Sequence, residues 1–524
     1  MSLRLPVQPA ESPGIAPLAE ARITGGMNSR FDAADIPPSV ATLLKNARTS
    51  ADNTQRAPGF VELSGTRPDT RPVLMYTQYT RFDGSVVFLR FTEDRVDKYA
   101  AGSYTALTGT LNGSAADGIR WITTADATRD YFIFTNNGAD PIQVLNPAVT
   151  SFAQLGNAGR YRYVCSFFNR IVAANRVDAV SPNPVLIAWS GDFNFAEWNP
   201  INDISAGSTP LTEAQSDYAD PITGLFAFAS VMLILRERSL WTATKRPVAS
   251  NPFAFSAAFP SVGCDTPSSA SQMRNGIVWY DFRSNQVYVY QVGQAPVPIG
   301  SPVKNDILGA ITDKDLVWGS YDAVSNTYIL TIPSTSTTIS KIFFYNFDTE
   351  SWHYDEVANA YGYYPVDGGA TRLTYDQLAG TYDQLAGAGT YNNIGAVAES
   401  PPKNFIGTTE GRILEEIPTS DTMSGEFRWE SKVFRMSVGD QAVNKLMLLF
   451  EPTRTGSMTL EYRRNGGDWK LYKTVSFNSV DGRTRVYCKK NIRANEFQWR
   501  IRSSSGNFKL LEYKIEMSPS LEDK

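Results

Sequence analysis

Short runs rich in Val, Ile, Tyr, Phe and Trp recur along the chain, each bounded by Gly, Asn, Asp or Ser. Such runs are typical of β-strands separated by turns. They pair into hairpin-like units such as 83–99, 128–145, 274–292 and 316–357, which begin roughly 40 to 55 residues apart. Hairpins at that spacing indicate propeller blades, each a small four-stranded antiparallel sheet. We therefore expect an all-β fold with a β-propeller of six to seven blades; a β-sandwich with satellite hairpins is the alternative.

After about residue 420 the pattern changes to strands of alternating or apolar character, as in 425–436, 456–477 and 495–517. A stretch of about 100 residues with six to eight short strands is typical of an independent β-sandwich. We therefore divide the chain into three parts. They are an extended Pro-rich N-terminal arm (1–22), a β-propeller-like domain (23–420) and a C-terminal β-sandwich domain (421–524).

The N-terminal arm has no core of its own, because residues 1–22 contain four prolines and few apolar anchors. Pro presets an extended backbone and removes a hydrogen-bond donor, which suits a strap laid across another protein. We expect the arm to be ordered only by a neighbouring subunit. The same prolines argue against a signal peptide, and no apolar run reaches the about 20 residues that a membrane helix needs.

The charge balance and the cysteines exclude several classes of protein. The chain has 49 Lys and Arg against 53 Asp and Glu, a net charge of −4, so tight general binding to nucleic acid is not expected. Cys165, Cys264 and Cys488 are far apart and odd in number, which excludes a disulfide framework and a metal knuckle. We expect buried free thiols in a reducing compartment.

The stretch TYDQLAGTYDQLAGAGTYNN (374–393) repeats nearly the same sequence three times. Tyr382 follows Tyr375 by seven residues, the spacing of a helical heptad, and Tyr391 follows nine residues later. A coiled coil needs apolar residues at two positions of several heptads, whereas here one Leu recurs among glycines. We therefore predict a loop insertion (366–393) late in the propeller domain. Such a loop could contact a partner; a tolerated duplication on the surface is the alternative.

No sequence motif for catalysis is present. The sequence lacks GxxxxGK[ST], a strand-linked GxGxxG and the Ser-x-Asp-x-Gly-x-Thr-Trp box of sialidases. Glycoside hydrolysis needs two nearby carboxylates, and no motif pairs them. His353 is the only histidine, which argues against a His-rich metal site and a Ser-His-Asp triad. We expect no enzymatic activity, no cofactor and no catalytic or metal-binding residue, and we expect His353 at a surface or an interface.

Tryptophan and tyrosine side chains are the candidate structural or interface positions. The tryptophans at strand positions flanked by apolar residues are expected to pack between blades. The stretch YNFDTESW (345–352) resembles the blade ending of kelch-like propellers, in which the Trp packs in this way. The candidates are Trp189, Trp198, Trp279, Trp318, Trp352, Tyr375, Tyr382 and Tyr391.

Four segments resemble, in order, the propeller-type nozzle or hub (tail tubular) proteins of short-tailed double-stranded DNA bacteriophages. The repeats at 374–393 are similar to the Tyr/Trp-Asp-x-Leu repeats of that family, and 497–517 resembles its closing sandwich strands. The opening stretch 23–60 and the third-blade motif 169–200 carry further matches, although Ala57 departs from the pattern. The matching residues are Gly25, Gly26, Pro37, Asn46, Arg56, Pro58 and Gly59, and then Trp189, Ser190, Gly191, Asp192 and Trp198.

The resemblance implies a structural virion protein of the phage tail, arranged as a homo-oligomeric ring, usually a hexamer. The ring extends the DNA ejection conduit below the portal and adaptor. The implied partners are adaptor and portal-side proteins, tail fibre or spike proteins, passing double-stranded DNA and the host cell surface. Such a protein is assembled in the host cytoplasm and located in the virion tail. A receptor-binding or a polysaccharide-degrading tail protein remains the alternative.

Overall fold

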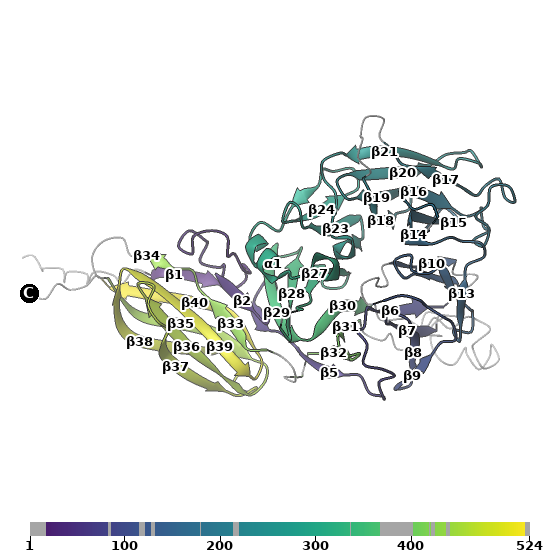
Figure 1. The fold of residues 1–524 in the computed structure, drawn as a ribbon. Coiled ribbons are helices and arrows are strands. Elements are labelled where there is room, and N and C mark those ends of the chain that lie inside the picture. Colours follow the sequence, from purple (N-terminus) through teal and green to yellow (C-terminus); the bar gives the residue numbers. More distant parts are fainter. Residues whose placement is uncertain are drawn as a thin grey trace, which may run out of the picture. The chain divides into compact units, whose positions relative to one another are not determined.

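The computed structural model is nearly all-β and β-propeller-like, with many small sheets (Figure 1). It describes residues 17–81, 85–114, 121–126, 131–178, 180–212, 220–335, 337–366, 402–418, 420, 425–435 and 441–518. Within these ranges the helices are short: α1 (Lys304–Ala310), η1 (Pro267–Ser269) and η2 (Lys314–Leu316). None of these helices has the length or the apolar character needed to cross a membrane.

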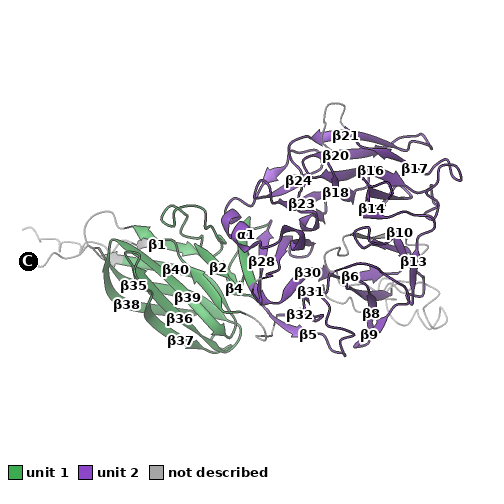
Figure 2. Cartoon of the chain, in the orientation of Figure 1, with its two compact units in different colours: residues 1–57, 348–355, 424–524 green, residues 58–347, 356–423 purple. Residues whose placement is uncertain are grey.

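The chain forms two compact units (Figure 2). Unit 1 consists of three separate segments, Met1–Ala57, Asp348–Asp355 and Ser424–Lys524. Unit 2 consists of Pro58–Phe347 and Glu356–Met423.

Unit 2 is a series of small antiparallel sheets in which strands follow one another in chain order. Five of these sheets are each made of four consecutive strands. They are β6 (Met75–Thr80), β7 (Val86–Phe91), β8 (Val96–Ala100), β9 (Ser103–Ala106); β10 (Trp121–Asp126), β11 (Tyr131–Thr135), β12 (Gln143–Leu145), β13 (Phe152–Gln154); β14 (Tyr161–Phe167), β15 (Arg170–Arg176), β16 (Asn183–Trp189), β17 (Gly207–Pro210); β18 (Ile222–Ala227), β19 (Val231–Arg236), β20 (Leu240–Lys245), β21 (Phe253–Phe259); and β22 (Ser271–Met273), β23 (Gly276–Asp281), β24 (Gln286–Gln291), β25 (Val297–Pro298).

The last two sheets of unit 2 complete the series. One contains β26 (Trp318–Asp322), β27 (Thr327–Ile332) and β28 (Ile339–Asn346). The other joins β30 (Ala360–Val366), β31 (Lys403–Thr408) and β32 (Ile413–Ile417) to β5 (Gly59–Glu62), the first strand of the unit. The two ends of unit 2 are therefore held together by strand pairing, with Gly59 opposite Ile417.

Neighbouring sheets share their apolar cores, and β19 illustrates the arrangement. Met232 and Ile234 pack with residues of the β14–β17 sheet, while Leu233 and Leu235 pack with residues of the β22–β25 sheet. Successive side chains of a strand point to opposite faces, so a strand between two cores must be apolar at every position. This explains why the five apolar residues of β19, Val231 to Leu235, are all buried.

A buried ion network lies at the start of the series. Arg90 on β7 bonds Asp97 on β8 at 2.7 Å and Asp69 at 2.6 Å. Asp69 belongs to the segment that leads from β5 to β6, so Arg90 anchors that segment to the first sheet. Arg90 and Asp97 are fully buried, and removing either partner would leave an unpaired buried charge.

Unit 1 contains two sheets assembled from distant parts of the chain. The first has the order β3 (Ala47–Thr49), β4 (Thr54–Arg56), β40 (Phe508–Ser518), β35 (Gln441–Pro452), β38 (Thr484–Ala494), with β1 (Pro17–Arg22) also paired to β40. The second has the order β2 (Leu43–Lys45), β33 (Phe427–Glu430), β39 (Glu496–Ser505), β36 (Gly456–Arg464), β37 (Lys470–Phe477), with β34 (Phe434–Arg435) paired to β39. Strand β29 (Ser351–Ala358) begins in this unit, where Tyr354 pairs with Lys45.

Aromatic side chains from the two sheets of unit 1 contact one another. Trp429 and Trp499 belong to the second sheet, and their ring centroids are 4.7 Å apart. Tyr513 on β40 of the first sheet lies 5.1 Å from Trp499. Phe427 on β33 meets Phe508 on β40 at 5.2 Å. The core of unit 1 therefore includes aromatic contacts between its two sheets.

The observed division differs from the expected one, which assigned 23–420 to the propeller domain. Residues up to Ala57 and the segment Asp348–Asp355 lie in unit 1 instead. The physical cause is long-range hydrogen bonding. Asn46 donates from Nδ2 to the Glu426 carbonyl at 2.7 Å, and Arg56 donates from Nη1 to the Gly506 carbonyl at 2.7 Å.

The end of the N-terminal arm is ordered within its own chain, contrary to the expectation that only a neighbouring subunit orders it. Residues 17–22 form β1, and five of them pair with β40, from Pro17 opposite Glu516 to Arg22 opposite Glu512. An unpaired edge of β40 offers backbone donors and acceptors to any extended segment, which suits a Pro-containing strand at the edge. Residues 1–16 lie outside the described residues.

Candidate interaction surfaces

The predicted tryptophans lie in different environments. Trp189 contacts Phe253 edge to face at 5.6 Å, within a core shared by two sheets. Trp279 packs with β19 and β20 residues and donates from Nε1 to the Gly263 carbonyl at 2.8 Å. Trp318 is half-buried, with its ring 5.8 Å from that of Tyr364 in the β30 sheet. All three side chains therefore serve packing within unit 2.

Trp352 and Trp198 differ from this group. Trp352 is buried, and its segment belongs to unit 1, where its carbonyl accepts the Met27 N–H at 2.7 Å. The packing of its indole between blades stays a prediction. Trp198 is half-buried in a loop, stacked on Tyr161 at 6.1 Å. The predicted loop 366–393, with Tyr375, Tyr382 and Tyr391, lies beyond Val366 and outside the described residues.

His353 is buried, not at the surface or interface expected from the sequence. Burial holds the pKa of His353 well below its ordinary value, and the positive charge of Arg48 adds to this effect. Arg48 itself pairs with Asp355 at 2.6 Å. The imidazole of His353 is therefore neutral and shielded from solvent near neutral pH.

The thiols of the described residues are buried, and the acidic side chains there form no metal-binding group. Cys165, Cys264 and Cys488 are free and buried, which confirms that expectation. Burial raises the pKa of all three thiols, that of Cys488 to about 11, so they are not reactive thiolates near neutral pH. No group of three or more His, Cys, Asp or Glu in the described ranges could hold a metal ion.

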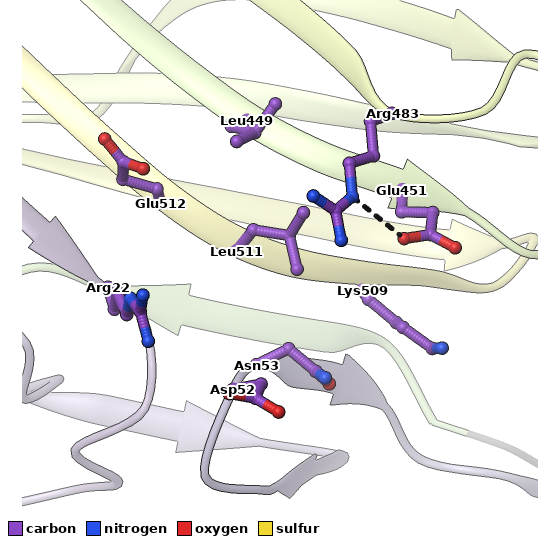
Figure 3. A pocket seen from close by; sticks show the side chains of 9 residues that line it. All are labelled: Arg22, Asp52, Asn53, Leu449, Glu451, Arg483, Lys509, Leu511 and Glu512. Carbon is purple, nitrogen blue, oxygen red and sulfur yellow. Dashed lines mark ion pairs between the residues drawn. The ribbon is translucent and has the colours of Figure 1, made fainter.

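A polar cleft of about 440 Å³ lies in unit 1, above β40 (Figure 3). It forms at a β-bulge: Leu449 lies opposite Glu512 and Phe450 opposite Leu510, so Leu511 has no partner on β35. The bulge turns Leu511 and Glu512 to the same outer face.

Charged side chains surround this cleft. Three cations, Arg22, Arg483 and Lys509, alternate with three carboxylates, Asp52, Glu451 and Glu512. Arg483 and Glu451 form an exposed ion pair at 3.6 Å. The cleft has neither a nucleophile with a base nor an aromatic floor for a sugar. Its chemistry is that of a surface for charged partners.

The edge next to this cleft is strongly basic. Strands β37 and β38 are the outermost strands of their sheets, and Tyr472 on β37 donates its hydroxyl to the Cys488 carbonyl on β38 at 3.0 Å. We call the exposed cations of these strands the basic edge. They are Lys470, Lys473, Arg485, Lys489, Lys490 and Arg493.

The sequence contained a signal for the basic edge that total charge concealed. Residues 463–493 hold nine Lys or Arg and two Asp. Counted by unit, unit 1 has 25 Lys and Arg against 20 Asp and Glu, whereas unit 2 has 24 against 33. The net charge of −4 is thus the sum of a basic unit, +5, and an acidic unit, −9.

Unit 2 presents an acidic loop between β16 and β17, residues 190–206, which contains the third-blade motif. The acidic loop has three carboxylates, on Asp192, Glu197 and Asp203, and no Lys or Arg. Neutral donors lower the pKa of Glu197, chiefly the Asn157 amide. They also lower the pKa of Asp203, chiefly the Ser205 hydroxyl. These bonds hold both carboxylates ionised without neutralising their charge.

Comparison with known proteins adds little. No family model matches the chain, and neither does any curated protein. Among solved structures it is similar to PorZ, a surface component of the type-IX secretion system of Porphyromonas gingivalis. That match has 12% identity and a TM-score of 0.35, and covers 80% of this chain but only 46% of PorZ.

Two further solved structures show weaker similarity. A quinonprotein alcohol dehydrogenase-like protein of Bacteroides thetaiotaomicron matches with 12% identity and a TM-score of 0.32, covering 54% of this chain and 66% of that one. A carbohydrate-binding module of Cellvibrio mixtus lichenase 5A matches with 16% identity and a TM-score of 0.15, covering 19% and 84%. At these scores none of the three assigns a function to this chain.

Proposed function

We propose that this chain is a structural protein of a bacteriophage tail, a nozzle or hub. Its copies form a ring, six in number, around the DNA ejection path below the portal and adaptor of the virion. In this proposal unit 2 is a seven-bladed β-propeller and unit 1 a β-sandwich. The support for seven blades is six four-stranded sheets, the last of which is completed by β5 from the start of the unit, together with the paired strands β26, β27 and β28.

The observation that carries the proposal is the role of the opening motif, which resembles that of tail proteins. Gly26 has a positive φ of 68°, and a Cβ there would lie 2.6 Å from the Ser351 Cβ. Asn46 and Arg56 bond backbone carbonyls of the C-terminal segment. The matching residues of the opening stretch up to Arg56 thus belong to the same unit as the closing strands 497–517, as expected if the motif specifies a shared architecture.

The charge distribution suits a conduit. Each phosphate that Lys or Arg neutralises adds salt-dependent affinity, so a wall that lets DNA slide should be acidic. Unit 2 carries a net charge of −9 and meets this requirement. Unit 1, with its basic edge, is suited to contacts with other proteins of the tail.

Purified particles of the virus that encodes this chain test the proposal. Quantitative mass spectrometry should find the chain at six copies per particle, and an electron-microscopy map should place it as a ring on the tail axis. Absence from particles would contradict the proposal. A copy number that is a multiple of three, with a peripheral location, would instead identify a receptor-binding protein.

The polysaccharide-degrading alternative has a separate test. The purified chain is incubated with host surface polysaccharide, and reducing ends are measured. We expect no turnover, because the cleft carboxylate Glu451 is paired with Arg483 and His353 is buried. Robust hydrolysis would identify a tail depolymerase.

A further inference from the structure

The basic edge is poorly neutralised by its own chain. Within the described ranges none of its six cations forms an ion pair with a carboxylate. Two apolar side chains, Leu471 and Tyr487, are exposed among these cations. Lysines on edge strands also prevent aggregation, but that purpose does not require exposed apolar groups between them.

The acidic loop has the complementary composition. Ile201 and Ile204 are 89% and 70% exposed, although the loop around them is closely hydrogen-bonded. Asp203 N donates to the Asn199 carbonyl at 3.0 Å, and Asp192 N donates to the Ser205 hydroxyl at 2.8 Å. A loop held in one conformation that presents bare isoleucines beside ionised carboxylates is a preorganised contact surface.

We propose that the basic edge of one copy of this chain binds the acidic loop of another copy. Lys and Arg side chains would face Glu197 and Asp203, whose hydrogen bonds come from neutral groups, whereas Asp192 already pairs with Arg170 at 3.3 Å. Leu471 and Tyr487 would cover the exposed isoleucines. The two surfaces lie on different units, so the contact is heterologous and each copy offers both halves. This inference rests on the proposed ring and names the surfaces that join its copies.

Zero-length crosslinking tests the contact in the full-length chain. Equal amounts of ¹⁴N- and ¹⁵N-labelled protein are mixed at low ionic strength and treated with a carbodiimide, which joins amines to carboxylates in contact. We expect crosslinks of mixed isotope composition between Lys473 or Lys489 and Glu197 or Asp203. The absence of such crosslinks at every protein concentration, or their occurrence only within one isotope, would overturn the proposal.

Charge-reversal variants test the same contact through the strength of self-association. The variant K489E/R493E places acidic groups opposite an acidic loop, and E197K/D203K places basic groups opposite the basic edge. Each variant alone should self-associate about tenfold more weakly in sedimentation, and an equal mixture of the two should recover association. The control R246E/R274E makes the same charge change at exposed sites of unit 2 and should leave association unchanged.

Two further measurements distinguish loss of the contact from misfolding and from binding of a polyanion. The isosteric E197Q/D203N variant keeps the shape of the loop and should weaken association even if E197K/D203K fails to fold. If K489E/R493E leaves association unchanged but abolishes binding to a duplex oligonucleotide, the basic edge is a polyanion site and the proposal is wrong. Failure of this contact leaves the copy number in particles, which tests the proposed function, unaffected.

Discussion

Units 1 and 2 are both β-structures, but their strands pair over very different distances in the sequence. In unit 2 most paired strands are chain neighbours, joined by short turns, and β5 is the exception. In unit 1 strand β40 pairs with β1, β4 and β35, so that Pro17 lies opposite Glu516. The units also differ in charge sign, +5 against −9. Unit 2 thus consists mainly of hairpins between neighbouring strands, whereas unit 1 consists of strands that come from distant parts of the chain.

Truncation of a buried tryptophan in each unit should give the largest loss of stability, and the loss should be confined to the unit that carries the substitution. Trp279→Ala and Trp352→Ala each remove a buried indole, and each should cost about 3–5 kcal/mol of stability. Hydrogen exchange read by mass spectrometry should show faster exchange in β18–β24 for the first variant and in β33–β40 for the second. Faster exchange of β26–β28 in Trp352→Ala would show that the Trp352 side chain packs against the propeller strands.

Arg56 tests whether the opening stretch belongs to unit 1. Its guanidinium donates to the carbonyls of Gly506 and Ser504, so Arg56→Met should leave buried acceptors unpaired and cost about 2–3 kcal/mol. Chemical denaturation followed by tryptophan fluorescence measures the loss. Arg56→Lys, which keeps the charge but cannot form the same pair of bonds, should recover only part of it. Full stability of Arg56→Met would contradict the assignment.

The single histidine gives unit 1 a loss of stability between pH 6.5 and 5 that no histidine gives unit 2. Burial lowers the pKa of His353 in the folded chain, whereas the unfolded chain binds a proton below about pH 6.5. Stability is therefore complete above that pH, and it should fall by up to about 1.4 kcal/mol per pH unit between pH 6.5 and 5. Denaturation curves across this range measure the slope. His353→Gln should abolish it in unit 1 and leave unit 2 unchanged; a slope that survives the substitution would assign it to another group.

Truncation of the N-terminal arm should have the smallest effect. Deleting residues 1–16 leaves β1 intact and should not change the melting temperature. Deleting 1–22 removes β1 from the edge of β40 and should cost unit 1 about 1 kcal/mol, because only edge hydrogen bonds and little core are lost. Differential scanning calorimetry of both truncations provides the measurement. Equal melting temperatures for the two deletions would show that β1 contributes nothing to the isolated chain.

Features that depend on neighbouring residues were predictable, and features that depend on distant ones were not. Alternation and turn residues predicted the strands of unit 2, including the paired runs at 274–292 and 316–346. The same reasoning placed Trp352 with its sequence neighbours, because nothing local indicates that 348–355 joins another unit. His353 was assigned to the surface for the same reason. The basic edge was readable from residues 463–493, but the total charge concealed it.

The sequence by itself determined the strands, the absence of the catalytic motifs considered and the buried free thiols. Each follows from residue type and short-range pattern, since strand periodicity and turn chemistry act over a few residues. Only the tertiary structure decided which strands share a sheet across hundreds of residues, as with Gly59 and Ile417 or Gln55 and Lys509. Such pairings are settled by satisfying backbone donors and acceptors and by burying apolar faces over the whole chain. For that reason the partition into a basic and an acidic unit became visible only once the chain was folded.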